Sequence, residues 1–265
     1  MRAKSAALGV LFAMVPMFPV LAEQSSSVAE INFQQPKPGM TRAYENGRKK
    51  HMAWHKAQKD TWSWFTWEVV TGDNTGMYLT GTFKHGWKDF DGREKFDQAD
   101  TADFDANVGA SVAHSSMSYY VERADISLSL TPASSTPAAL TAVTVFALKA
   151  ESVNEFVEAV KKINEGIKKT NYPQPGPSRW YQLVNGGEGP QFVLVGDRAN
   201  WAAFQSNDKT LDGMMEDAYG KEQGAAILAS LRKAIRAIHT SANKYRPDLS
   251  YVAPTIVAAA GSPAQ

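Results

Sequence analysis

Two stretches of similar pattern decide the fold: WEVVTGDNTGMYLTGTFKHGWKDF at Trp67–Phe90 and WYQLVNGGEGPQFVLVGDRANWAAF at Trp180–Phe204. Each contains a β-rich run, a turn rich in glycine and a second β-rich run, which is the pattern of a hairpin. Each then continues into Trp-x-x-Phe, where we expect a helix to begin. The repetition predicts two copies of one α+β unit in a single chain.

Matching elements precede the two hairpins. Polar and apolar residues alternate over Val28–Gln34, which predicts a strand, and a helical period follows over Met40–Gln58. In the second half, Leu140–Leu148 reads as a strand, and the amphipathic segment that begins at Ser152 reads as a helix. Each half therefore begins with a strand and a helix.

Matching elements also follow the hairpins. The first half continues with an expected helix over Asp89–Ala113 and a strand over Ser116–Leu130. The second half continues with a long helical pattern over Leu211–Ala242 and a short strand around Tyr245–Val252. Both halves thus read strand, helix, strand, strand, helix, strand.

Two such halves resemble the dimeric α+β-barrel superfamily of ferredoxin-like proteins, which includes the antibiotic-biosynthesis-monooxygenase-like and NIPSNAP-like proteins. The resemblance rests on the order of the elements and on the Trp-x-x-Phe after each hairpin, and it covers most of the mature chain. It implies an α+β fold in which two tandem ferredoxin-like βαββαβ repeats form an intramolecular barrel. No catalytic motif of a member is evident, so the resemblance carries little functional weight.

The ends of the chain differ in composition from its middle. A basic start and an apolar segment that ends in small residues at Ala22 predict a cleaved signal peptide and a periplasmic or secreted protein. No later stretch is apolar enough to predict a transmembrane segment. The expected organisation is a signal peptide at 1–22, a first repeat at 23–131, a linker at 132–139, a second repeat at 140–254 and a disordered tail at 255–265.

Charge and cysteine content exclude several classes of function. Lysine and arginine number 28 against 27 acidic residues, so no basic field predicts nucleic-acid binding. The chain has no cysteine, which excludes disulfides, thiolate metal sites and a cysteine nucleophile.

A histidine pair is the candidate metal site. His51 and His55 lie four residues apart on one predicted helix, a spacing at which two imidazoles can bind one metal ion, with Glu68 or His85 as a third ligand. Zinc, copper or iron would suit such donors.

Alignment of the two repeats favours a structural role for these histidines. When Lys49-Lys50 is aligned with Lys161-Lys162, His51 falls on Ile163 and His55 falls on Ile167. The isoleucines are expected to face the sheet, so the histidines are expected to do the same, and the sequence predicts no bound cofactor.

Haem is a related alternative, because chlorite-dismutase-like and dye-decolourising proteins use tandem copies of this fold class. The resemblance implies a proximal histidine in the second half, where the chain has only His239. Its counterpart in the first half is His114, which favours a shared structural role.

The aromatic run before the first hairpin is the candidate ligand site. Side chains alternate along a strand, so Trp62, Trp64 and Glu68 share one face. An unpaired carboxylate under helices is costly, and Glu68 therefore favours this set as the face of the barrel lumen. The alternative is that the aromatic rings fill the barrel and leave no cavity. Thr66 lies on the same strand face as Trp62, Trp64 and Glu68, and the opposite face carries Phe65, Trp67 and Val69.

An Arg-x-Asp pair recurs in both halves, at Arg123 and Asp125 and at Arg246 and Asp248. Arg123 could hold an anionic ligand. Because scaffold features are those that a duplication retains, an ion pair that fixes the end of a strand is favoured.

The sequence thus predicts a non-catalytic module that binds a small apolar or aromatic molecule, or that stabilises an envelope assembly. The candidate binding residues are Trp62, Trp64, Glu68, His85 and Arg123. One alternative is an enzyme similar to the cofactor-independent monooxygenases, with Glu68 or His85 as the catalytic group. A second is a metal- or haem-binding protein that uses first-half histidines. Whether the protein is an enzyme, and its oligomeric state, stay open.

Overall fold

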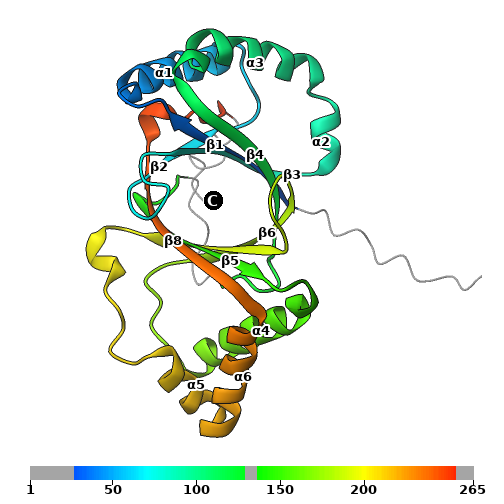
Figure 1. Ribbon diagram of the computed structural model, residues 1–265, viewed down its shortest axis with the longest axis vertical. Coiled ribbons are helices and arrows are strands. Elements are labelled where there is room, and N and C mark those ends of the chain that lie inside the picture. Colours follow the sequence, from blue (N-terminus) through cyan, green and yellow to red (C-terminus); the bar gives the residue numbers. More distant parts are fainter. Residues whose placement is uncertain (1–26, 129–135, 255–265) are drawn as a thin grey trace, which may run out of the picture.

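The computed structural model describes residues 27–128 and 136–254. The expected signal peptide, part of the expected linker and the expected tail lie outside the described residues. Eight strands form a closed barrel, with one layer of helices outside each half (Figure 1).

The first half contains four strands and three α-helices. They are β1 (Val28–Pro36), α1 (Thr41–Ala57), β2 (Phe65–Val69), β3 (Tyr78–His85), α2 (Trp87–Asp91), α3 (Glu94–Asn107) and β4 (Val112–Glu122), with a 3-10 turn η1 (Gly109–Ser111) before β4.

The second half repeats this order. It contains β5 (Leu140–Leu148), α4 (Val153–Thr170), β6 (Ser178–Asn185), β7 (Gln191–Arg198), α5 (Leu211–Tyr219), α6 (Lys221–Ala234) and β8 (Ile235–Tyr245), with 3-10 turns η2 (Ala150–Ser152), η3 (Trp201–Phe204) and η4 (Pro247–Leu249).

Strand order confirms the predicted fold. The barrel runs β1-β3-β2-β8-β5-β7-β6-β4, so each half supplies four neighbouring antiparallel strands in the ferredoxin-like order. Two seams join the halves, where β2 pairs with β8 and β4 pairs with β6. The second sheet comes from the same chain, as the duplication predicts.

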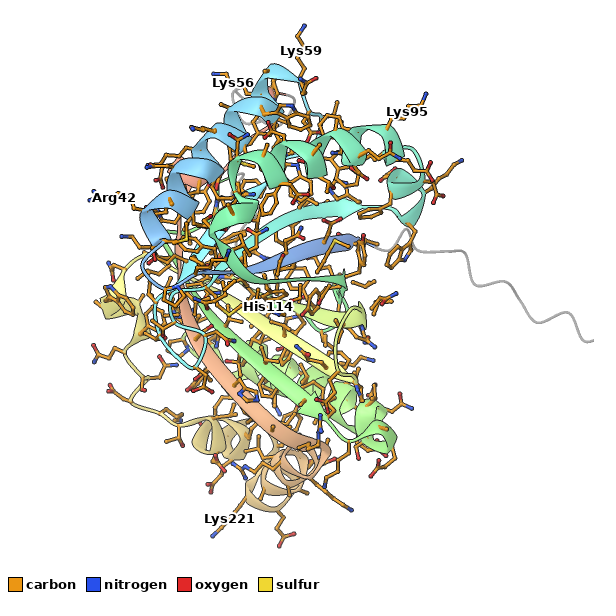
Figure 2. All side chains as sticks on the ribbon, turned by 45° about the horizontal axis from the view of Figure 1, so that its top comes forward. Arg42, Lys56, Lys59, Lys95, His114 and Lys221 are labelled. Carbon is orange, nitrogen blue, oxygen red and sulfur yellow. The ribbon has the colours of Figure 1, made fainter. Side chains whose placement is uncertain are left out.

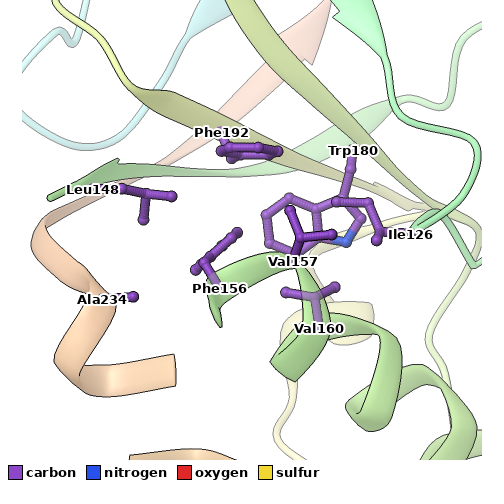
Figure 3. Packing of buried hydrophobic residues seen from close by; sticks show 8 residues of the cluster. All are labelled: Ile126, Leu148, Phe156, Val157, Val160, Trp180, Phe192 and Ala234. Atoms are coloured by element: carbon purple, nitrogen blue, oxygen red, sulfur yellow. The ribbon is translucent and has the colours of Figure 1, made fainter. Parts of the chain in front are cut away.

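The second-half core lies between α4 and its sheet. Phe156 is fully buried and contacts Trp180 of β6 and Phe192 of β7, with ring centroids 5.6 and 5.3 Å away (Figure 3). In the first half, Tyr44 of α1 occupies the corresponding place and contacts Tyr78 of β3 at 4.7 Å. Aromatic side chains thus attach the first helix of each half to its sheet.

The outer faces of the helices carry charge. Arg42, Lys56, Lys59, Lys95 and Lys221 project away from the body of the molecule (Figure 2). Among the described residues, no helix combines the length and hydropathy needed to cross a bilayer.

Two element predictions were wrong. The closing strand expected around Tyr245–Val252 lies instead at Ile235–Tyr245, and the 3-10 turn η4 follows it. The helical pattern over Leu211–Ala242 ends at Ala234, and Ile235 begins β8. The pairing of β8 with β5, from Leu148 opposite Ile235 to Leu140 opposite Lys244, outweighs the helical period of this segment. His239, expected near the end of a helix, therefore lies within a strand.

Candidate metal centre

The strongest cluster of chemically active side chains lies between α1 and α3. His51 and His55 stand one turn apart on α1, and Asp100 faces them from α3. The two histidine Nε2 atoms are 3.3 Å apart, and each is 3.2 Å from Asp100 Oδ1. Three donor atoms therefore form a nearly equilateral triangle inside the protein.

Both imidazoles are oriented by their other nitrogen. His51 Nδ1 lies 2.8 Å from Asp103 Oδ1, and His55 Nδ1 lies 2.9 Å from Asp60 Oδ2. A carboxylate accepts hydrogen bonds, so each Nδ1 carries a hydrogen and donates it. The lone pair of each Nε2 consequently points into the triangle, as in the carboxylate–histidine pairs that support metal ligands.

Further hydrogen bonds fix the two supporting carboxylates. Asp60 is almost fully buried and accepts from Arg93 Nη1 at 2.9 Å, from Trp64 Nε1 at 2.9 Å and from the Trp62 amide at 3.0 Å. Asp103 accepts from Asn107 Nδ2 at 3.1 Å. These bonds hold the histidine rings in one orientation.

Asp100 Oδ1 is buried and makes no hydrogen bond within the described part of the chain, although both Nε2 atoms are near it. Each Nε2 is 3.2 Å from this oxygen, so a hydrogen carried by either nitrogen could be donated to it. Three converging lone pairs would repel one another, so the arrangement favours a cation, which can be a proton on one imidazole or a metal ion between the three atoms.

The pKa directions agree with a positive charge on or beside the imidazoles. Burial alone raises the pKa of Asp100, but the nearby His51 and His55 rings outweigh it and hold the pKa below its ordinary value. Burial lowers the pKa of His55, but Asp100 and Asp60 outweigh it and raise that pKa.

The triangle matches the size of a transition-metal site. Zinc lies about 2.0–2.2 Å from nitrogen and oxygen ligands. The centre of a triangle with sides of 3.2–3.3 Å is about 1.9 Å from each corner, so such an ion fits just off its plane. Two imidazoles and one carboxylate suit zinc and iron, and they leave coordination positions open.

Aromatic rings surround the histidines. Trp54 stacks on His51 with centroids 6.0 Å apart, and Phe104 meets the same ring edge-on at 5.4 Å. Tyr251 stacks near His55 at 5.9 Å. The histidines are at most 3% exposed, whereas the Asp100 side chain is 21% exposed, so Asp100 is the group of the three that is nearest to solvent.

Close approach of the helices depends on Gly47. A Cβ atom at this position would overlap the backbone carbonyl oxygen of Asn107 at the end of α3. The glycine therefore allows α1 and α3 to come close enough for His51 to reach Asp103.

Both predicted third ligands were wrong. Glu68 Oε2 binds Arg246 Nη1 at 3.0 Å, and the His85 ring stacks on Trp62 at 3.7 Å. Lys84 has a positive φ of 67°. This backbone kink interrupts the regular alternation of side chains just before His85, so the strand period does not give the direction of that ring. The third donor is Asp100.

The predicted lumen face was also wrong. Trp64 is buried with Met52 of α1, and Thr66 Oγ1 donates to the Leu249 carbonyl at 2.9 Å, so this set lies beneath the helix layer. The prediction assumed an unpaired Glu68, but Arg246 pairs with it. Phe65 and Trp67 belong to the opposite face, which lines the lumen.

Aromatic rings meet across the lumen. Phe83 of β3 lies 6.2 Å from Tyr181 of β6, although these strands are not neighbours in the barrel. Phe65 and Trp67 lie beside Tyr245 at 6.4 and 5.9 Å. Trp67 Nε1 is buried and has no hydrogen-bond partner among the described residues.

The repeated Arg-x-Asp pairs form ion pairs, as favoured from sequence. Arg123 Nη2 donates to Asp125 at 2.7 Å, and its Nη1 donates to Gln182 at 2.7 Å. Arg246 binds Asp248 in the same way. The guanidinium of Arg123 is thus already engaged, and a ligand role for it stays a prediction.

The positions of His239, His51 and His55 do not suit a haem ligand. The His239 side chain is 64% exposed, and its Nδ1 atom lies 3.9 Å from Asp73 Oδ2. His51 and His55 are enclosed by aromatic rings and already bonded through Nδ1.

Sequence reasoning identified the two histidines but missed the carboxylates around them. Asp100 and Asp103 are three residues apart and share one face of α3, a spacing that could have indicated a partner for the pair. Asp60 carried no comparable signal.

No known family model matches the chain, and no curated protein is significantly similar to it. Solved structures share its fold. An anthrone oxidase-like protein is 14% identical, with coverage of 84% of this chain and 92% of its own and a TM-score of 0.52. A proposed monooxygenase from Fusobacterium nucleatum is 10% identical, with coverage of 84% and 93% and a TM-score of 0.54.

A chlorite dismutase variant from Candidatus Nitrospira defluvii is 8% identical, with coverage of 91% of this chain and 98% of its own and a TM-score of 0.51. These identities establish a shared fold and nothing finer. That fold is an α+β barrel made of two ferredoxin-like halves.

Proposed function

We propose that this member of the dimeric α+β-barrel fold is a metalloprotein whose centre, formed by His51, His55 and Asp100, serves oxidoreductase-type chemistry. One observation carries the proposal: three donor atoms lie 3.2–3.3 Å from one another while the Nδ1 atom of each histidine is bound to a separate carboxylate. Carboxylates that bind the Nδ1 atoms of two histidines are the arrangement that orients metal-ligating imidazoles.

The donor set narrows the choice of metal. Imidazole and carboxylate ligands favour a divalent first-row transition metal over calcium or magnesium. Two histidines and one carboxylate with open positions are also the ligand set of non-haem iron oxygenases. The names of the fold neighbours, an anthrone oxidase-like protein and a proposed monooxygenase, support an enzyme more than a passive binding module.

The chain's own groups have distinct roles at this centre. Asp60 and Asp103 hold the Nδ1 hydrogens and so keep each Nε2 free as a ligand. Arg93 binds both oxygens of Asp60 and, with the other bonds to that carboxylate, holds its pKa low although burial opposes this. When bound, the metal would supply a Lewis acid or a redox centre, and the exposed edge at Asp100 is the side from which a small molecule would approach.

Metal analysis of the full chain tests this proposal. We expect about one transition-metal ion per chain after purification without chelators, and a Co²⁺ derivative with visible d–d bands. The double variant His51→Ile/His55→Ile places the second-half residues at these positions and should bind none. His114→Ala removes an exposed histidine and should bind as the wild type does. Equal metal content in the double variant and wild type would overturn the proposal.

Binding of a small apolar or aromatic molecule in the lumen is the second candidate function. Its support is the ring-lined lumen and the unpartnered Trp67 Nε1, which could donate to a ligand. Fluorescence titration with 1-naphthol tests it. We expect quenching in the wild type that is lost in Trp67→Phe, and equal responses would contradict it.

We also propose that the chain is exported and that its signal peptide is cleaved after Ala22.

A further inference from the structure

Helix α3 has few apolar attachments to the rest of the molecule. None of its residues is fully buried, although it is fourteen residues long. Its inward face presents Asp100 and Asp103 between Phe96 and Phe104. Hydrophobic burial therefore contributes less to its position than in an ordinary covering helix.

The corresponding layer of the second half is attached differently. Met214, Met215, Ala218 and Leu228 of α5 and α6 are at most 2% exposed and pack with Ile163 and Ile167 of α4. Those isoleucines align with His51 and His55. The second half thus has an apolar contact at the place where the first half has the histidine–aspartate centre.

Polar bonds from α3 converge on the same centre. Asp100 and Asp103 reach His51 directly, and Arg93, just before α3, reaches His55 through Asp60. Without a positive charge between them, Asp100 Oδ1 and the two Nε2 atoms repel one another in a medium of low dielectric constant. A cation in the triangle would therefore strengthen this polar attachment of α3, in addition to the packing of Phe104 and the Arg93–Asp60 ion pair.

The inward face of α3 is itself polar. Asp100 and Asp103 meet the histidines there, and Arg93 binds Asp60 just before the helix begins. Movement of α3 away would hydrate these polar groups instead of exposing a large apolar core.

We propose that metal binding at His51, His55 and Asp100 controls the docking of α3 on α1, so that the first-half helix layer opens when the metal leaves. The inference rests on the proposed metal site and adds a metal-dependent conformational change. Asn107, which lies against Gly47, and Arg93, which binds Asp60, would hold the two ends of α3, and the segment around Asp100 would loosen most.

Hydrogen exchange of the full chain tests the inference. Mass spectrometry would follow peptides covering 94–107 and 211–234 in protein loaded with Zn²⁺ and in protein treated with EDTA. We expect metal removal to lower the protection of α3 amides by roughly tenfold or more and to leave α5 and α6 within about twofold. In His51→Ile/His55→Ile, exchange of α3 should no longer respond to Zn²⁺.

The outcomes separate the two proposals. Stoichiometric Zn²⁺ binding with unchanged exchange of α3 would overturn metal-controlled docking and leave the metal site in place. Failure to bind Zn²⁺, Fe²⁺ or Co²⁺ would overturn both. Asp103→Asn, which keeps all three ligands, should give an intermediate loss of protection at a fixed low Zn²⁺ concentration. An unchanged response in this variant would also count against the inference.

Discussion

Helices α1 and α4 occupy equivalent places in the two halves, yet they use their buried faces differently. Tyr44 and Phe156 align with each other and are both fully buried against their sheets. One turn later, Arg48 of α1 aligns with Val160 of α4, and both are at most 4% exposed. The sheet-facing contact has been kept in both halves, whereas a guanidinium in one half stands where the other has an apolar side chain.

The difference continues toward the second helix layer. Ile163 and Ile167 pack with α5 and α6, whereas His51 and His55 meet the carboxylates of α3. The second half shows that apolar residues at these positions are sufficient for the fold. Buried ionisable groups cost free energy where apolar residues would serve, so the first-half set is better explained by function than by stability.

The largest expected effect comes from removal of the shared aromatic anchor in the second half. Phe156→Ala should lower the free energy of unfolding by about 3–5 kcal/mol, because it leaves a cavity between α4 and the sheet. Urea denaturation measures the loss. Metal content should be unchanged in the folded variant, and a parallel loss of metal would show that the two halves are not independent.

Substitution at Gly47 should disrupt the contact between α1 and α3. Gly47→Ala forces a Cβ atom against the Asn107 carbonyl, and we expect a loss of about 1–3 kcal/mol in stability together with weaker metal binding. Thermal unfolding and Co²⁺ titration measure the two effects. The control is Gly92→Ala, since a Cβ there meets nothing within 4 Å. Equal behaviour of the two variants would contradict the close approach of the helices.

A smaller effect is expected from the carboxylate that supports His51. Asp103→Asn removes a charge but preserves shape, and metal affinity should fall by about 10–100-fold with little change in fold. Competition with a chelating dye measures the affinity. Asp105→Asn, on the exposed face of α3, is the matched control, and a similar loss there would point to a general charge effect.

The smallest effect is expected at an exposed ion pair of the second half. Arg232 Nη2 lies 2.9 Å from Asp212, and both side chains are at least 60% exposed. Arg232→Ala should change stability by less than about 1 kcal/mol and leave metal content unaltered. A change above 2 kcal/mol would show that α5 and α6 depend on polar contacts as well, which would weaken the contrast between the halves.

The fold was predictable because its evidence is local. Hairpin turns, alternation and helical periods repeat in the same order, and each can be read within a short window. The predicted end of the helix at Ala242 was wrong because pairing with β5, almost ninety residues earlier in the chain, decides where β8 begins. Local period alone cannot contain that information.

The site was predictable only in part for the same reason. The spacing of His51 and His55 is local and indicated a metal pair, but Asp100 joins them through the packing of α3 on α1. The choice of lumen face failed because the partner of Glu68, Arg246, lies 178 positions away in the sequence. Long-range pairing converted a carboxylate that looked costly under the helices into a satisfied one.

Crystallography of the full chain grown with Zn²⁺ tests the metal centre most directly, with data collected on both sides of the zinc absorption edge. The structure predicts an anomalous peak about 2.0–2.2 Å from His51 Nε2, His55 Nε2 and Asp100 Oδ1. Absence of a peak between α1 and α3, or a peak only at exposed groups such as His239 and Asp73, would contradict it.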